Sequence, residues 1–113
     1  MARVSTHVLD TARGVPASCI LVELYFGQTH LKSAATNAEG RTDELLISTP
    51  ELTVGTYELV FHAGDYFRAL KLPLTDPLFL DKIAIRFGIS DPRGNYHVPL
   101  LLSPYGYSTY RGS

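Results

Sequence analysis

Ile83-Ala84-Ile85-Arg86-Phe87-Gly88-Ile89 is the stretch of sequence that decides the fold. Its odd positions are large and apolar, whereas its even positions are small or charged. Because successive side chains of a β-strand point to opposite faces of the sheet, this alternation predicts a strand with one face in the core. Two further stretches, from Ser18 to Phe26 and from Tyr57 to His62, show the same period of two.

Shorter runs of the same kind complete the pattern. We expect further strands at residues 2–9, 32–36, 42–47, 96–103 and 105–110. Turn residues separate these runs roughly every ten residues, a spacing that is typical of a sandwich. The sequence therefore predicts an all-β fold, a two-sheet β-sandwich of about seven to eight strands, in a single domain over residues 1–113.

Only residues 64–72 have the pattern of a helix. Asp65 is a candidate N-cap, Phe67 and Leu70 are apolar residues three apart, and Pro73 is a stop signal. We expect one short helix of at most two turns. The apolar loop at residues 78–80 is expected to pack into the core.

The composition limits the classes of function. The formal net charge of the 113-residue chain is -1, and neither Lys nor Arg is in excess, so nucleic acid and anionic membranes are not expected partners. The sequence has neither a transmembrane run nor the basic and apolar regions of a signal peptide. We expect a cytoplasmic protein.

Two histidines are candidate acid–base groups. His7 and His97 each lie in an expected strand, on the side opposite the apolar residues Val4/Val8 and Val98/Leu100 respectively. An imidazole titrates near neutral pH, so an outward-facing strand histidine is suited to proton transfer, although most such residues are ordinary surface groups. Arg41 follows Gly40 and could clamp an oxyanion.

The remaining titratable candidates have weaker support. His30 and His62 are expected to be surface residues, and Cys19, beside the apolar run at residues 20–22, is expected to be a buried hydrophobic side chain rather than a nucleophile. His7, His97 and Asp10 are residue types that bind zinc, but their spacing matches no usual zinc pattern. We expect no metal site.

The last four residues combine unusual chemistry. Tyr110-Arg111-Gly112-Ser113 places an aromatic ring, a permanent cation, a flexible glycine and a hydroxyl beside the terminal carboxylate. Because chain ends are usually tolerant of change, so particular a string favours a site. A final edge strand with a polar tail is the alternative reading.

Three segments together resemble the transthyretin-like family. They are Ser5–Gly14, Gly64–Arg68 and His97–Tyr105, the last of which runs on into Tyr110–Ser113. The resemblance covers essentially the whole chain and is closest to the enzymatic branch of that family, the 5-hydroxyisourate hydrolases, whose most specific mark is the terminal tetrapeptide. Hormone-carrying transthyretins share the sandwich but have other residues at the positions of His7 and His97.

The resemblance implies hydrolysis of 5-hydroxyisourate to 2-oxo-4-hydroxy-4-carboxy-5-ureidoimidazoline in urate degradation, without a cofactor. A histidine would deprotonate water, and an arginine, Arg41 or Arg111, would stabilise the oxyanion. The residues leave open which histidine is the base. In the favoured assignment, His7 activates water and His97 holds the substrate or the leaving group. The implied catalytic residues are His7, Arg41, His97 and Ser113, and the implied substrate-binding residues are Tyr110, Arg111 and Gly112.

The resemblance also implies a homotetramer, a dimer of dimers with sites at the subunit interface. Tyr105, Tyr107 and Tyr110 are of the type enriched at interfaces, and an edge strand of that composition needs cover. Two rival functions remain open. One is a non-catalytic binder of an aromatic small molecule, and the other is a purely structural sandwich.

Overall fold

The alternating stretch that opens the sequence argument forms β7, Lys82–Ile89, at the edge of a four-stranded sheet. In the computed structural model, which describes residues 1–113, Ile83, Ile85 and Ile89 of this strand are buried. The other three strands of the sheet, in the order β4-β3-β6-β7, are β4 (Thr29–Ala35), β3 (Leu21–Phe26) and β6 (Gly55–His62).

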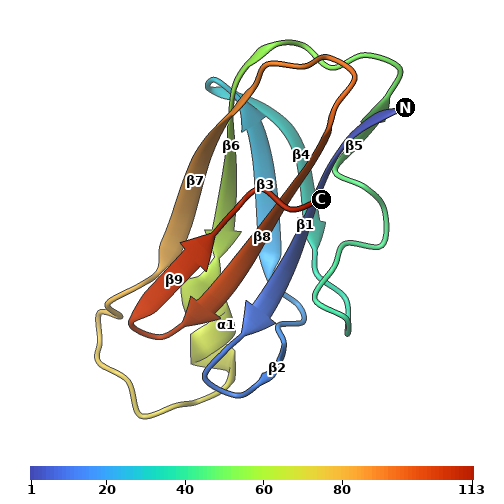
Figure 1. Ribbon diagram of the computed structural model, residues 1–113. Helices are drawn as coiled ribbons and strands as arrows, with labels where there is room; N and C mark the ends of the chain where they lie inside the picture. The colour runs from blue at the N-terminus through green and yellow to red at the C-terminus, as the bar shows by residue number, and fades with distance from the viewer.

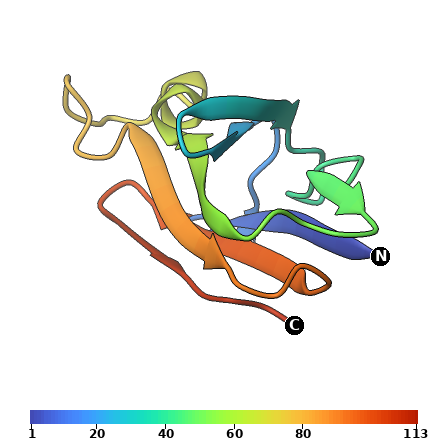
Figure 2. The same ribbon diagram turned by 90° about the horizontal axis from the view of Figure 1, so that it is seen from above.

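The second sheet has the order β2-β1-β8-β9, and β5 pairs with β1 beside β2. Its strands are β1 (Ala2–Asp10), β2 (Val15–Pro16), β5 (Ile47–Thr49), β8 (Asn95–Ser103) and β9 (Gly106–Thr109). Figures 1 and 2 show the two sheets as separate layers, with the only helix, α1 (Ala63–Ala69), at one end. The predicted two-sheet sandwich with one short helix is confirmed. The structure has nine strands rather than seven to eight, and the shortest of them, β2, has only two residues.

The core fills the space between the sheets. Twenty-two buried apolar residues form one cluster there. Even-numbered residues of β1 and β8, such as Val4, Val8 and Leu100, point into it and are fully buried. The odd-numbered residues of β1 therefore lie on the outer face of the sheet, where they take no part in the core.

The strand expected at residues 42–47 is wrong except at its last residue. Thr42 and Asp43 instead form hydrogen bonds through their side chains, from the Thr42 hydroxyl to the Glu44 carbonyl and from the Asn37 amide to Asp43. Local bonds of this kind compete with a strand ladder. Thr42 forms only an isolated bridge with Thr36, and the continuous pairing of β5 begins at Ile47.

The helix and the loop after it differ from expectation in detail. The helix begins at Ala63, so Asp65 is not its N-cap but lies in its first turn and pairs with Arg68 at 3.1 Å. Phe79 is 70% exposed and stacks loosely with Tyr105, so the apolar loop at residues 78–80 packs only partly against the core. No helix in the structure has the length and apolar character needed to cross a membrane.

Two further expectations are wrong. Cys19 is exposed, because it precedes β3 in a turn with a positive φ of 63° and so escapes the strand alternation. His62 is not an ordinary surface residue. Its side chain is only 13% exposed, and its Nε2 atom lies 2.6 Å from Glu23 on the neighbouring strand. His30 is exposed, as expected.

A buried polar network joins β1 to the helix. Asp10 is 1% exposed, accepts a hydrogen bond from the Arg13 amide at 3.0 Å, and accepts another from the Tyr66 hydroxyl at 2.7 Å. The Arg13 guanidinium donates to the same hydroxyl at 3.3 Å. Burial, together with the Asp10 carboxylate, raises the pKa of Tyr66 and keeps its hydroxyl protonated as a donor. This network satisfies a carboxylate that would otherwise be costly to bury.

We predict that Tyr66→Phe destabilises the fold by about 1.5–3 kcal/mol, because it removes a hydrogen bond to a buried charged group. Urea unfolding followed by circular dichroism measures this change. Tyr25→Phe is the matched control, since the Tyr25 hydroxyl also donates to a carboxylate, that of Glu23, but on the outer face of the other sheet. A loss for Tyr66→Phe no larger than for Tyr25→Phe would contradict the assignment.

Candidate functional site

The register of β1 against β8 builds the centre of the site. The two strands are parallel, and Ser5 lies opposite His97. Both side chains point outward, away from the core, and the Ser5 hydroxyl lies 2.8 Å from the Nδ1 atom of His97. The Nε2 atom of His97 is left without a protein partner and is available for chemistry.

A turn places the second and third candidates. Arg41 forms an antiparallel bridge with His7, so the loop that carries Arg41 lies along the edge of β1. The Nε2 atom of His7 lies 2.8 Å from the Glu39 carbonyl oxygen. Because a carbonyl only accepts, Nε2 carries the proton, and in a neutral imidazole Nδ1 is then the basic nitrogen.

The C-terminal residues return to β8 after β9 ends. The Gly112 amide donates to the His97 carbonyl at 2.7 Å, in the same antiparallel register that pairs β9 with β8. A Cβ atom on Gly112 would lie 2.6 Å from Cδ2 of the His97 ring. Only glycine allows the tail to pass this close to the imidazole, and the next residue, Ser113, reaches the site.

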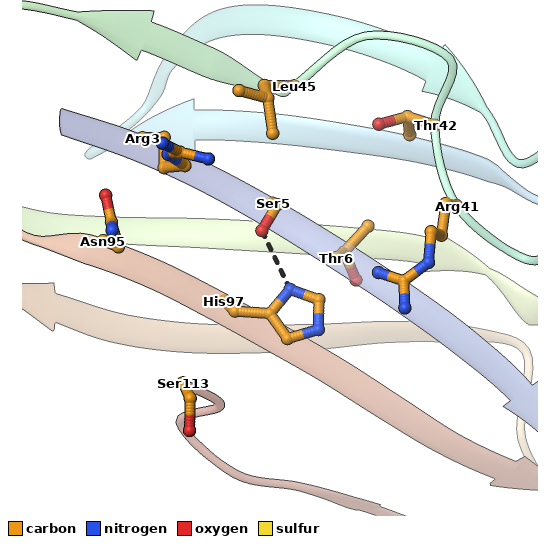
Figure 3. Close-up of a pocket in the computed structure, with 9 residues that line it drawn as sticks. All are labelled: Arg3, Ser5, Thr6, Arg41, Thr42, Leu45, Asn95, His97 and Ser113. Carbon is orange, nitrogen blue, oxygen red and sulfur yellow. Dashed lines mark hydrogen bonds between the residues drawn. The ribbon is translucent and has the colours of Figure 1, made fainter. Parts of the chain in front are cut away.

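One cavity of about 500 Å³ collects these groups on the outer face of the sheet (Figure 3). Its volume is within the range of small-molecule sites. Figure 3 shows His97 from β8, Arg41 from the loop before β5 and Ser113 from the tail around the same space. The lining residues are Arg3, Ser5, Thr6, Arg41, Thr42, Leu45, Asn95, His97 and Ser113.

Three of the four residues named as catalytic therefore lie together, and the fourth is adjacent. His7 does not line the cavity but is paired with Arg41 at its border. Tyr110 and Arg111 line a different, largely apolar pocket of about 240 Å³ between β7 and the tail. The guanidinium carbon of Arg111 lies 4.2 Å from the centre of the Tyr96 ring, and Arg111 also donates to the Asn95 carbonyl at 3.3 Å. Its charge is therefore engaged by a cation–π contact and a main-chain hydrogen bond.

Several lining residues were not identified from the sequence. Arg3 and Ser5 share a strand face with His7, and Asn95 precedes His97 by two, so strand alternation was the signal that could have found them. Thr42 and Leu45 lie in the irregular loop before β5, where no periodicity applies.

The three residues considered as zinc ligands do not all lie on the same face of the sheet. Asp10, one of the three residue types considered for zinc, points into the core and bonds to Tyr66, on the opposite side of β1 from His7. No three His, Cys, Asp or Glu side chains of the chain gather closely enough to hold a metal ion.

Electrostatics keep His97 in its neutral form. Burial lowers the pKa of His97 below its ordinary value of 6.5, and the nearby Arg41 and His7 side chains lower it further. At neutral pH this imidazole is therefore a proton acceptor rather than a cation.

The chain is similar in sequence to known proteins over almost its whole length. The sequence model described as the HIUase/Transthyretin family matches residues 4–112. The chain is 55% identical over 115 residues to 5-hydroxyisourate hydrolase 2 of Rhizobium meliloti (strain 1021), with 98% of this chain and 96% of that protein covered.

Two solved structures have the same fold. The structure of Klebsiella pneumoniae 5-hydroxyisourate hydrolase superposes with a TM-score of 0.86 at 34% identity, and the whole of both chains is covered. The crystal structure of (S)-allantoin synthase superposes with a TM-score of 0.93 at 39% identity. That match covers 99% of this chain but only 44% of the (S)-allantoin synthase chain.

We predict that the His97 imidazole titrates below pH 6.5 in an NMR titration, and that Arg41→Gln moves its midpoint up towards 6.5 without reaching it. Removing the cation relieves one cause of the lowered pKa, while burial of the ring, the larger cause, persists. Because the folded-state pKa is depressed, this group's contribution to stability is present above pH 6.5 and is lost as the pH falls.

Arg86→Gln is the control for this titration, since Arg86 lies on β7 and pairs with Glu58 on the other sheet. A His97 midpoint at or above 6.5 in the unmodified protein would contradict the electrostatic description. An equal shift in Arg86→Gln would show that the effect is not local.

Proposed function

Because the chain belongs to the HIUase/Transthyretin family, we propose that it hydrolyses 5-hydroxyisourate to 2-oxo-4-hydroxy-4-carboxy-5-ureidoimidazoline, a step of urate degradation. The observation that carries this proposal is the convergence of His97, Arg41 and Ser113 on one cavity. An imidazole kept neutral, a guanidinium and a hydroxyl supply a base, an oxyanion donor and a polar anchor for a flat, hydrogen-bonding ring.

In the proposed reaction His97 is the general base. The base must be the tautomer that carries its proton on Nδ1, which then donates to the Ser5 hydroxyl 2.8 Å away. The lone pair of Nε2 is left to accept a proton from a water molecule that enters the cavity. The water loses a proton to Nε2 as its oxygen bonds to a ring carbonyl carbon of the substrate. The lowered pKa of His97 supports this role, which the sequence had favoured for His7.

Arg41 stabilises the oxyanion that forms. Its side chain makes no salt bridge or hydrogen bond within the protein, so its donors are free for the substrate oxygen. A preorganised donor of this kind contributes roughly a hundredfold to a thousandfold. When the carbon–nitrogen bond breaks, the imidazolium of His97 returns its proton to the leaving ring nitrogen, and the product carries the new carboxylate.

The other site residues named from the sequence take supporting roles in the proposal. Ser113 orients the water or the substrate with its hydroxyl. Gly112 holds the tail against His97. Arg111 anchors it over the Tyr96 ring, and Tyr110 lines the same pocket, which is not the cavity at His97. His7 holds the substrate through its free Nδ1 atom at the border of the cavity. Lack of a cofactor and a cytoplasmic location stay predictions from the sequence.

We also propose that residues 1–113 act as one domain within a homotetramer, a dimer of dimers. The outer face of the β1–β8 sheet supports this, since its cavity is open in the single chain. Three tyrosines of the β8–β9 hairpin and the tail are also exposed. Tyr105, Tyr107 and Tyr110 have exposed fractions of 60%, 47% and 59%. In an assembly this face would be covered and each site would gain residues from a second subunit.

We predict that the purified chain accelerates the ultraviolet decay of 5-hydroxyisourate, generated from urate by urate oxidase, and yields a product with a circular dichroism signal. His97→Gln should lower kcat by roughly a hundredfold to ten-thousandfold, because it removes the base. Deleting Arg111–Ser113 should abolish most activity while the far-ultraviolet spectrum of the fold persists.

His30→Gln is the matched control, because His30 is exposed on β4 and bonds only to Ser33. It should keep the activity of the unmodified chain. Decay no faster than the spontaneous rate would reject the hydrolase and favour a binder of aromatic small molecules, which the loss of His97 would scarcely affect.

We predict that sedimentation velocity detects a tetramer and that specific activity falls on dilution below the concentration at which the assembly dissociates. A composite site loses part of its lining in the free chain, so activity and assembly decline together. A monomer that is stable and fully active at nanomolar concentration would reject the composite site.

A further inference from the structure

The turn that carries Arg41 is organised by a single side chain, that of Asn37. Its Oδ1 atom accepts hydrogen bonds from the Glu39 amide at 2.9 Å and from the Arg41 amide at 3.3 Å. Its Nδ2 atom donates to Asp43 at 3.0 Å. Its main chain closes the turn, with the Asn37 amide 2.7 Å from the Arg41 carbonyl oxygen.

This turn sets the chemistry of His7. The Glu39 carbonyl accepts from Nε2 of His7, so the position of that peptide decides which ring nitrogen is protonated. The Glu39 amide, at the other end of the same residue, is held by Asn37. If the turn relaxed, the carbonyl would no longer face Nε2, and both neutral tautomers would become accessible.

The same turn sets the direction of Arg41. The Arg41 side chain has no hydrogen-bond partner in the protein, so its main chain alone sets the point from which the guanidinium enters the cavity. That main chain is held on one side by Asn37 and on the other by the bridge to His7. Gly40, between them, accepts from the Val8 amide at 2.8 Å and so attaches the turn to β1.

We propose that Asn37, which does not touch the cavity, is the positioning residue for both Arg41 and His7 in the proposed hydrolysis. The inference rests on the proposed function. The proposal requires that the Asn37 side chain position two groups of the site, Arg41 and His7, which come from different segments of the chain. Displacing a catalytic group by about 1 Å costs on the order of a hundredfold in rate, so a defect in the turn should be visible kinetically.

A role in folding alone would give a different result. Asn37 is half-buried in a surface turn, and turns of this type contribute to stability wherever they occur. A purely structural residue would change the melting temperature but leave the tautomer of His7 and the relative values of kcat and KM in the folded protein as they were.

The first arm of the test is kinetic. The unmodified chain is assayed on 5-hydroxyisourate, followed by Asn37→Ala, which removes all three side-chain bonds. We expect kcat/KM to fall by roughly tenfold to a hundredfold in protein that remains folded by circular dichroism. Asp43→Asn is the matched control. It removes a charge from the same turn but leaves both bonds to Oδ1 and an acceptor for Nδ2, so it should stay within about twofold of the unmodified chain.

The rescue variant is Asn37→Asp/Asp43→Asn, which exchanges donor and acceptor between the two positions. A carboxylate at position 37 still accepts from the Glu39 and Arg41 amides, and the new amide donates back to it. We expect kcat/KM within about threefold of the unmodified chain. This variant keeps the proposal testable if Asn37→Ala folds poorly.

The second arm is independent of activity. The chain has four histidines, so nitrogen-15 spectra of the imidazole rings resolve the tautomer of each. We expect His7 in the Nε2–H form in the unmodified chain and in the rescue variant, and a mixture of tautomers in Asn37→Ala.

The proposal stands if kcat/KM falls and the His7 tautomer mixes in Asn37→Ala, and if both recover in the rescue variant. Any other combination in an active enzyme overturns it. If the unmodified chain has no activity, the proposed function fails by itself, and the nitrogen-15 spectra alone decide whether Asn37 controls His7.

Discussion

The site depends on the parallel pairing of β1 with β8. These strands lie far apart in sequence, and their register brings Ser5 opposite His97. Because side chains alternate strictly along a strand, a slip of one residue would turn His97 into the core and Tyr96 out to solvent. The buried residues on the inner face, among them Val4, Val8 and Leu100, forbid that slip. The hydrophobic core thus fixes the positions of polar groups that it never contacts.

The other groups near Ser5 and His97 belong to segments outside the regular strands. The tail reaches His97 through a main-chain hydrogen bond from Gly112, and the turn after β4 brings Arg41 to the edge of β1. Both are held by main-chain bonds to strands, which limits their freedom before any ligand arrives. Preorganisation of this kind lowers the reorganisation needed during a reaction.

Strand alternation made much of the fold predictable. Residues 83–89 and the outward position of His97 followed directly from the period of two, because burial repeats with the same period. The rule fails where side chains bond locally to the backbone, as at Thr42, or where a positive φ interrupts the strand pattern, as at Cys19. The membership of the cavity was only partly accessible for the same reason, since Leu45 reaches it from an irregular loop.

Chemistry at the chain end was predicted from residue types, but its division of labour was not. Arg111 and Arg41 are equivalent in sequence terms as free guanidinium groups. In the structure Arg111 lies over the Tyr96 ring, whereas Arg41 lines the cavity. Which cation lines the cavity depends on a packing contact between distant residues, and local pattern does not contain that information.

The side chains of β1 alternate between two faces of the sheet that have different roles. Ala2, Val4 and Val8 pack in the core, whereas Arg3 and Ser5 line the cavity on the outer face. Substitutions at the second set leave the packing volume of the sandwich unchanged. The outer face of this sheet can therefore be adapted to another ligand without any change to the side chains that fill the core.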